Sequence, residues 1–155
     1  MVLECNRIYT NRFPSLTFGQ DMKQVVNDTL EARRFLTENK SWQSEIGSWE
    51  IDLLFCERMV DIYGLKAESD SMQETKSTIT VSIHDLISIR LDNLKSRLKA
   101  NEGILSRLVD DELLLKDRQM PFRHSDDKRE MDNTRVLVLA LQGRLYSFIK
   151  ELKAL

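Results

Sequence analysis

The sequence contains few of the residues that break helices. Only five glycines and two prolines occur among its 155 residues. Collagen-like, linker-rich and turn-dense all-β architectures need those residues for their backbone geometry, so their scarcity excludes these classes. Hydrophobic residues make up 41% of the chain and charged residues 31%. At this length they are enough for one sizeable core, and a soluble, mostly helical domain is expected.

No charge of one sign dominates. The 23 basic residues are balanced by 25 acidic ones, for a net charge of −2. Nucleic-acid binding depends on a clustered positive field, whereas the basic residues here alternate with acidic ones, so we expect no nucleic-acid partner. The longest apolar run, 136–141, is far shorter than the roughly 18 residues of a membrane span. No secretory signal is recognisable in 1–10 either, and a cytoplasmic protein without a membrane partner is expected.

Residues for catalysis or metal binding are also scarce. Cys5 and Cys56 are too few for a disulfide framework, and their spacing matches no zinc or redox motif. His84 is expected to be partly buried and His124 to lie in an exposed loop, and neither belongs to the Glu-x-x-His pair of di-iron bundles. A Gly-rich phosphate loop and a nucleophile elbow are missing too. The sequence therefore predicts no catalytic residues, no metal site, no cofactor and no enzyme activity.

Three segments have a strong helical period, at about 42–65, 82–115 and 126–155. Their apolar positions alternate between steps of three and four residues, which keeps one stripe of each helix facing a neighbour. The three series are Trp42, Ile46, Trp49, Leu53, Cys56, Val60 and Tyr63; Ile87, Leu91, Leu94, Leu98, Asn101, Leu105 and Leu108; and Met131, Thr134, Val138, Leu141, Leu145, Phe148, Leu152 and Leu155.

Polar segments separate the predicted helices. The stretch 68–76 has no apolar period and is expected to be the first connection, and Pro121 interrupts the chain in the second, 119–124. Ser125, followed by two aspartates, is a suitable N-cap for the last helix. Because such connections favour antiparallel neighbours, the predicted fold is an all-α antiparallel bundle of three long helices with coiled-coil-like 3-4 spacing.

The first 36 residues are less regular. Pro14 and Gly19 interrupt an aromatic stretch, so residues 1–20 are expected to form an N-terminal arm, with 21–155 as a single helical domain. The segment 21–36 has its own apolar period and predicts a short fourth helix. It either docks as a separate helix or runs directly into the first long one.

Apolar residues also occur opposite the main stripes. A helix that is apolar on both sides must be covered on both sides. Antiparallel packing would gather most of these residues at one end of the bundle, where we expect an interaction surface. The last helix also has Val136 and Leu139 off its main stripe. The predicted surface consists of Ile51, Leu54, Phe55, Ile62, Leu65, Leu86, Ile89, Tyr146 and Ile149.

The sequence does not decide between two ways of covering this surface. Either the N-terminal arm and the 21–36 helix fold over it, or a second copy or a partner helix binds there. Asn101 interrupts a leucine series and has two interpretations as well. A buried amide fixes the register and the choice of partner, whereas an amide at the bundle surface is only hydrated.

Two functions follow as hypotheses. The first is a non-enzymatic helical interaction or assembly module that self-associates or binds a protein partner through the apolar surface. The alternative is a helical bundle that binds an apolar small molecule in an aromatic-lined cavity. The residues expected to line that cavity are Trp42, Trp49, Phe55 and Tyr63.

Overall fold

The protein is all-α. A computed structural model describes residues 18–110 and 119–154, and no strand occurs among them. The helices are α1 (Phe18–Tyr63), α2 (Asp70–Asp85), α3 (Asp92–Asp110) and α4 (Met120–Lys153). A short 3-10 turn, Gly64–Lys66, follows α1, and a π-helical segment, Leu86–Leu91, joins α2 to α3 without interruption.

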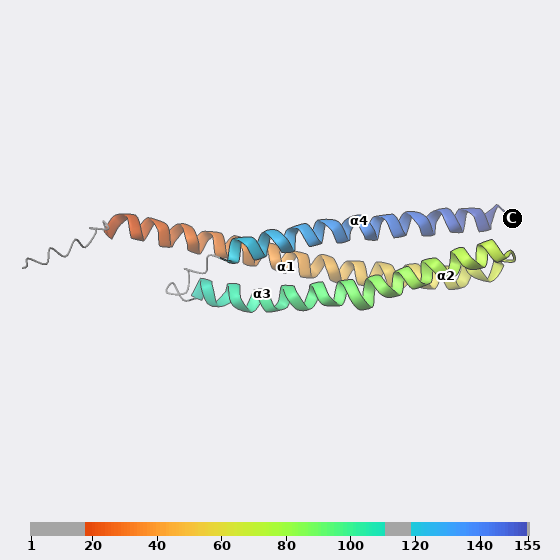
Figure 1. Ribbon diagram of the computed structural model, residues 1–155, viewed down its shortest axis with the longest axis horizontal. Helices are drawn as coiled ribbons and strands as arrows, with labels where there is room; N and C mark the ends of the chain where they lie inside the picture. Colours follow the sequence, from red (N-terminus) through yellow and green to blue (C-terminus); the bar gives the residue numbers. More distant parts are fainter. Residues whose placement is uncertain (1–17, 111–118, 155) are drawn as a thin grey trace, which may run out of the picture.

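The described chain runs three times along the length of the molecule (Figure 1). After α1, the chain reverses at the 3-10 turn, and α2 and α3 return alongside it. The last helix, α4, then runs in the same direction as α1. Ion pairs join the neighbouring elements: Glu45 of α1 with Arg135 of α4, and Glu50 of α1 with Lys95 of α3.

The segment 21–36 is part of α1 and does not form a separate fourth helix. Of the two alternatives, the separate docked helix is wrong, and the segment runs directly into the first long helix. No glycine or proline occurs between Gly19 and Gly47, so nothing stops helix propagation there. The helix also starts at Phe18, inside the expected arm, while residues 1–17 lie outside the described part. In Figure 1 the start of α1 lies at the opposite end from Tyr63, so 21–36 does not cover the surface around Ile62.

The predicted connection at 68–76 is mostly helical, and α2 begins at Asp70 instead of Ser82. Ser69 caps the helix, since its hydroxyl accepts a hydrogen bond from the backbone N–H of Met72. The first buried side chain of α2 is Ile79, so the earlier turns present little apolar period in the sequence. This polar first half is the reason that periodicity alone placed the helix start too late.

The last helix also begins earlier than predicted. Pro121 lies in the first turn of α4, where its missing N–H would have no intrahelical partner anyway. Ser125 is therefore an exposed residue within the helix and not its cap. The earlier start adds the six residues 120–125 to the helix. His124 is one of them and lies on the buried side, as does Asp127.

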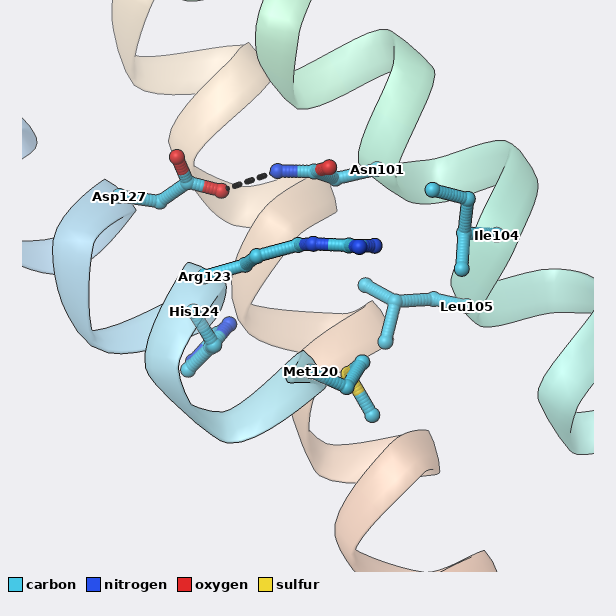
Figure 2. A pocket seen from close by; sticks show the side chains of 7 residues that line it. All are labelled: Asn101, Ile104, Leu105, Met120, Arg123, His124 and Asp127. Atoms are coloured by element: carbon cyan, nitrogen blue, oxygen red, sulfur yellow. Dashed lines mark hydrogen bonds between the residues drawn. The ribbon is translucent and has the colours of Figure 1, made fainter. Parts of the chain in front are cut away.

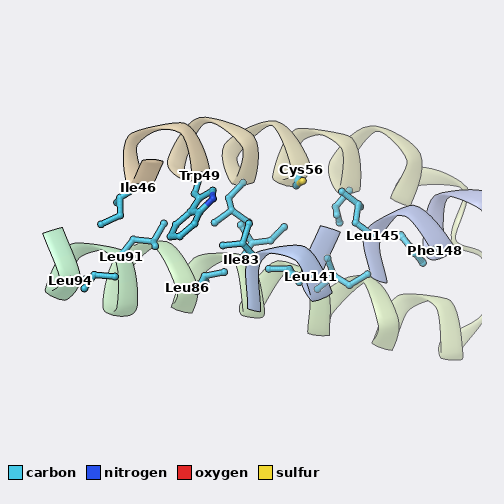
Figure 3. Packing of buried hydrophobic residues seen from close by; sticks show 14 of the residues in the cluster. Ile46, Trp49, Cys56, Ile83, Leu86, Leu91, Leu94, Leu141, Leu145 and Phe148 are labelled. Carbon is cyan, nitrogen blue, oxygen red and sulfur yellow. The ribbon is translucent and has the colours of Figure 1, made fainter. Parts of the chain in front are cut away.

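The core is a continuous apolar cluster between α1, α2–α3 and α4 (Figure 3). On α4 every residue of the predicted series from Met131 to Leu152 is buried. On α1 the buried side chains continue the predicted series towards the N-terminus, as far as Ala32. The cluster includes Ile46, Trp49, Cys56, Ile83, Leu86, Leu91, Leu94, Leu141, Leu145 and Phe148.

The π-helical segment changes which side is buried in the continuous helix that α2, this segment and α3 form. Leu86 and Leu91 are both buried although five residues apart, one more than an α-helical step allows. A π-helical turn accommodates one extra residue, and it rotates the preceding residues by about 100° relative to a regular helix. The expected series is therefore wrong before Leu91: Ile83 and Leu86 face the core, Ile87 is half-buried, and His84 is exposed.

No helix in the part of the chain that the structure describes has an apolar stretch long enough to cross a bilayer.

Candidate interaction surface

The outer side of α1 has a second apolar stripe, opposite its buried one. Ile51, Phe55, Ile62 and Leu65 are 62–82% exposed. Together with Arg58 they follow one another at steps of four and three residues. The positions from Ile51 to Ile62 therefore lie along one side of α1, and Leu65 lies just beyond its end, in the 3-10 turn. Single exposed apolar residues are ordinary, but a row of them along one helix is not typical of a free surface.

A similar stripe lies on the outer side of α4. Val136, Leu139 and Tyr146 are 61–72% exposed. Gly143 falls between Leu139 and Tyr146 in the same row, and a Cβ added to it would meet no atom within 4 Å. Three positions of this row thus carry apolar side chains, and the fourth, Gly143, has no side chain and free space around it.

Contacts between α1 and α4 show how the two helices are aligned. The guanidinium of Arg135 donates to both carboxylate oxygens of Glu45, and Lys153 lies 5.1 Å from the ring centroid of Tyr63. Each of these α4 residues has a number 90 larger than its α1 partner. Tyr146 is therefore level with Cys56, close to Phe55, and Leu139 is level with Trp49, close to Ile51.

Both stripes lean towards the line where α1 and α4 meet. On α1, Asp52 and Met59 follow Glu45 at intervals of seven residues and so lie on the side towards α4. Phe55 and Ile62 follow them by three residues and are their surface neighbours.

The same reasoning applies to α4. Gln142 and Ile149 follow Arg135 at intervals of seven, and Leu139 and Tyr146 are neighbours of this row. Met59 and Ile149, which belong to these two inner rows, are partly buried and pack against the core. Phe55, Ile62, Leu139 and Tyr146 thus lie beside the line between the two helices, and the other three residues flank them on the outer sides. The α1–α4 face is defined as the whole set, Ile51, Phe55, Ile62, Leu65, Val136, Leu139 and Tyr146.

The predicted surface residues lie in several places. Five of the nine belong to the α1–α4 face, and Ile149 is half-buried beside it. Leu54 is exposed but follows Glu50, the partner of Lys95, by four residues, so it lies towards α3. Leu86 was expected to be exposed and is buried, because the π-helical segment turns it inward. Ile89, still exposed, lies in a different part of the molecule, between the π-helical segment and α4.

Val136 and Leu139 were not included in the predicted surface. Their positions off the main stripe were visible in the sequence, but the surface was expected at one end of the bundle, and these two residues lie further from that end than Tyr146.

The groove that contains Ile89 has a volume of about 410 Å³. Its lining includes apolar side chains from the π-helical segment and α4 and the charged side chains of Asp85, Arg90 and Arg144. Arg90 also crosses to α4, where it donates to Thr134 (3.1 Å) and to Glu130 (2.6 Å). The apolar lining consists of Leu86, Ile89, Leu137, Ala140 and Leu141.

Asn101 joins a polar cluster between α3 and the start of α4. Its amide nitrogen donates to Asp127 at 2.5 Å (Figure 2). Arg97 pairs with the other oxygen of the same carboxylate at 2.7 Å. Asp127 is buried and Asn101 half-buried, so the amide has a defined partner. The small cavity at this cluster, about 10 Å³, is near the minimum that one water molecule needs.

His124 is buried, and the expectation of an exposed loop histidine is wrong. Its ring stacks against those of Phe35 and Trp42, with centroids 3.9 and 4.7 Å away. Its Nε2 lies 2.6 Å from a carboxylate oxygen of Glu38. Asn39, one residue further on, is fully buried, and its side-chain oxygen accepts a hydrogen bond from Gln43. These contacts join the first half of α1 to the start of α4.

The charged pairs are consistent with structural roles. The hydrogen bonds that Arg135 donates to Glu45 raise the pKa of Arg135, and those that Lys128 and Arg135 donate to Asp132 lower the pKa of Asp132. Burial, helped by Asp52, raises the pKa of the Cys56 thiol. Among the described residues, no three His, Cys, Asp or Glu side chains gather closely enough to hold a metal ion.

The four aromatic residues of the alternative hypothesis do not line one cavity together. Trp49 is part of the packed core, Trp42 stacks on His124, and Phe55 is exposed on the α1–α4 face. Tyr63 is partly buried and contacts Lys153. Neither of the two cavities described above includes any of the four.

Fold and surface define an all-α protein of long helices with an exposed apolar face. Compared with known proteins, the chain matches no family model, no curated protein and no solved structure.

Proposed function

We propose that this protein is a non-enzymatic helical interaction module that binds a protein helix, from a second copy or from a partner, on its α1–α4 face. The helices would form an antiparallel bundle with coiled-coil-like packing, whose role is to hold this face in a fixed shape. A rigid face of two neighbouring helices is the usual receptor for an amphipathic helix.

The observation that carries the proposal is the continuity of the apolar face across two helices. Seven large apolar side chains, each 61–82% exposed, lie in neighbouring rows of the two helices and of the turn that follows α1. Burying a side chain of this size contributes about 1.5–3 kcal/mol. Water-exposed rows of this extent are typical of protein-binding sites.

A photo-crosslinking amino acid at position 146 tests the proposal. Tyr146 is replaced by p-benzoylphenylalanine in the cell that makes the protein, and Phe122, an equally exposed aromatic residue at the start of α4, is replaced in the control. We expect a protein adduct from position 146 and none from position 122. The absence of an adduct at position 146, with helix content unchanged, would contradict the proposal.

The groove between the π-helical segment and α4 supports the second candidate function, binding of an apolar small molecule. Its volume lies within the range of ligand pockets, and its lining is apolar with a few charges at the sides. Replacing Ala140 by Trp would fill it. If the groove binds such ligands, the wild type should increase the fluorescence of an apolar dye and the Ala140→Trp variant should not.

A further inference from the structure

We propose that the occupant of the α1–α4 face is a second copy of this chain, docked antiparallel, so that Phe55 of each copy lies over Arg58 of the other. The inference rests on the proposed function, because it names the partner of the same surface. Three observations support it: the size of the face, its charges, and the position of Gly143.

The size of the face fits a stable dimer. An aromatic side chain has roughly 150–250 Å² of surface and an aliphatic one less, so the seven residues, each 61–82% exposed, expose on the order of several hundred Å² before their polar neighbours are counted. A specific interface of standard size needs about 800 Å² from each partner. One additional helix lying between α1 and α4 would leave the outer rows, such as Ile51 and Val136, partly uncovered, whereas a second copy covers both helices over their whole width.

Two symmetric arrangements place such a face on a copy of itself. A two-fold axis along the helices puts α1 over α4 of the second copy, with all helices parallel. A two-fold axis across them puts α1 over α1 and α4 over α4, antiparallel. Both are closed dimers in which the same surface is used twice.

The charges favour the antiparallel arrangement. In the parallel arrangement, the 90-residue offset between α1 and α4 places Arg58 at the same height along the helix axis as Phe148 of the second copy. Arg58 would then lie about 3 Å along this axis from Lys150 of the second copy. Both side chains are exposed, and this repulsion would occur twice.

In the antiparallel arrangement Arg58 faces the Phe55 ring of the second copy, which attracts a guanidinium. The same register places Ile51 against Ile62.

Gly143 fits this register as well. The alignment that sets Phe55 against Arg58 brings Tyr146 next to the two-fold axis and Gly143 opposite Lys150 of the second copy. The space beyond Gly143 is open, so the aliphatic part of Lys150 has room to lie there. Glycine inside a helix lowers its stability by about 1 kcal/mol relative to alanine. A close approach of the second copy gives this glycine a role.

Disulfide trapping tests both partner and direction. The variants carry Cys5→Ser, and Cys56 is buried in the core. Ile51→Cys protein is mixed with Ile62→Cys protein and oxidised gently, and Tyr146→Cys is oxidised alone. We expect a covalent dimer in both reactions and, by sedimentation, a wild-type mass of twice the chain at micromolar concentration. These positions are exposed, so helix content should not change.

Other results separate this inference from the proposed function. A wild-type dimer with no product from the Ile51→Cys and Ile62→Cys mixture, but a product from Phe55→Cys mixed with Tyr146→Cys, would show the parallel arrangement and overturn the register. A monomer whose position 146 crosslinks to another protein would overturn the inference and support the proposed function. A monomer without any adduct would overturn both.

Discussion

The guanidinium of Arg135 donates two hydrogen bonds, each 2.8 Å long, to the two carboxylate oxygens of Glu45. The two residues lie 90 positions apart in the sequence, and their pairing aligns α4 with α1. Arg135 also donates to Asp132 of its own helix and lies over the Trp49 ring at 5.9 Å. Because a planar fork meets a carboxylate here, lysine would not be an equivalent replacement.

The Glu45→Gln substitution should therefore lower the free energy of unfolding by about 0.5–1 kcal/mol, the upper part of the range for partly exposed pairs. Urea denaturation followed by circular dichroism measures the change. In the control, Asp126→Asn removes the exposed pair with Arg129 and should change stability by less than about 0.5 kcal/mol. Equal effects of the two substitutions would show that the bidentate geometry adds nothing.

His124 should contribute to stability through its two ring contacts. The His124→Ala variant loses the stacking on Phe35 and Trp42 and the contact with Glu38, and it leaves a void between α1 and α4. We expect a destabilisation of about 2 kcal/mol, measured by urea denaturation. The matched control is His84→Ala, an exposed histidine on α2, which should stay within about 0.5 kcal/mol of the wild type.

The π-helical segment predicts that one residue can be removed without loss of the fold. Deleting Ser88 would shorten the step from Leu86 to Leu91 to four residues, the spacing of a regular helix. The apolar residues on either side would stay buried, so the midpoint of thermal unfolding should be maintained or rise.

Deleting Ser96, an exposed serine in the regular α3 helix, is the control. It would rotate one part of the helix by a residue relative to the other. Several leucines would leave the core, and we expect a loss of at least about 3 kcal/mol. If the two deletions lowered the stability of the protein equally, the π-helical segment would not contain one residue more than a regular helix needs.

Cys56 should react slowly in the folded protein. Burial and the nearby Asp52 carboxylate raise its pKa above the usual thiol value, so less thiolate is present at neutral pH. In a Cys5→Ser variant, labelling with a thiol reagent should be slow and should accelerate in urea. Because the folded-state pKa is raised, the contribution of this thiol to stability is present below the unfolded pKa and is lost as the pH rises through the folded value. Fast labelling without urea would contradict the buried position.

The helical class and most of the core could be predicted from the sequence. The series from Met131 to Leu152 is buried at every position, because a stripe of apolar residues at helical spacing has to be covered wherever the helix lies. The helix ends were less predictable. Pro121 was expected to lie in the connection but occupies the first turn of α4, since proline is compatible with both places.

The burial of Leu86 and of His124 could not be predicted either, because each depends on a feature of helix geometry that the sequence does not reveal. A single extra residue in a π-helical turn rotates everything before it by about 100° around the helix axis, and it leaves no mark on composition. His124 depends on where α4 begins, and an isolated histidine beside an arginine in the sequence gives no sign of two aromatic partners on another helix.

The low glycine and proline content and the apolar periodicity determined that the chain forms long helices with more apolar surface than one stripe each requires. Only the tertiary structure decided which of those apolar residues meet. The pairing of Glu45 with Arg135 and the contact of Lys153 with Tyr63 align α1 and α4, and this alignment joins two separate rows into the α1–α4 face. Periodicity fixes directions around one helix axis, whereas the rotation and offset between two helices depend on contacts between residues far apart in the chain.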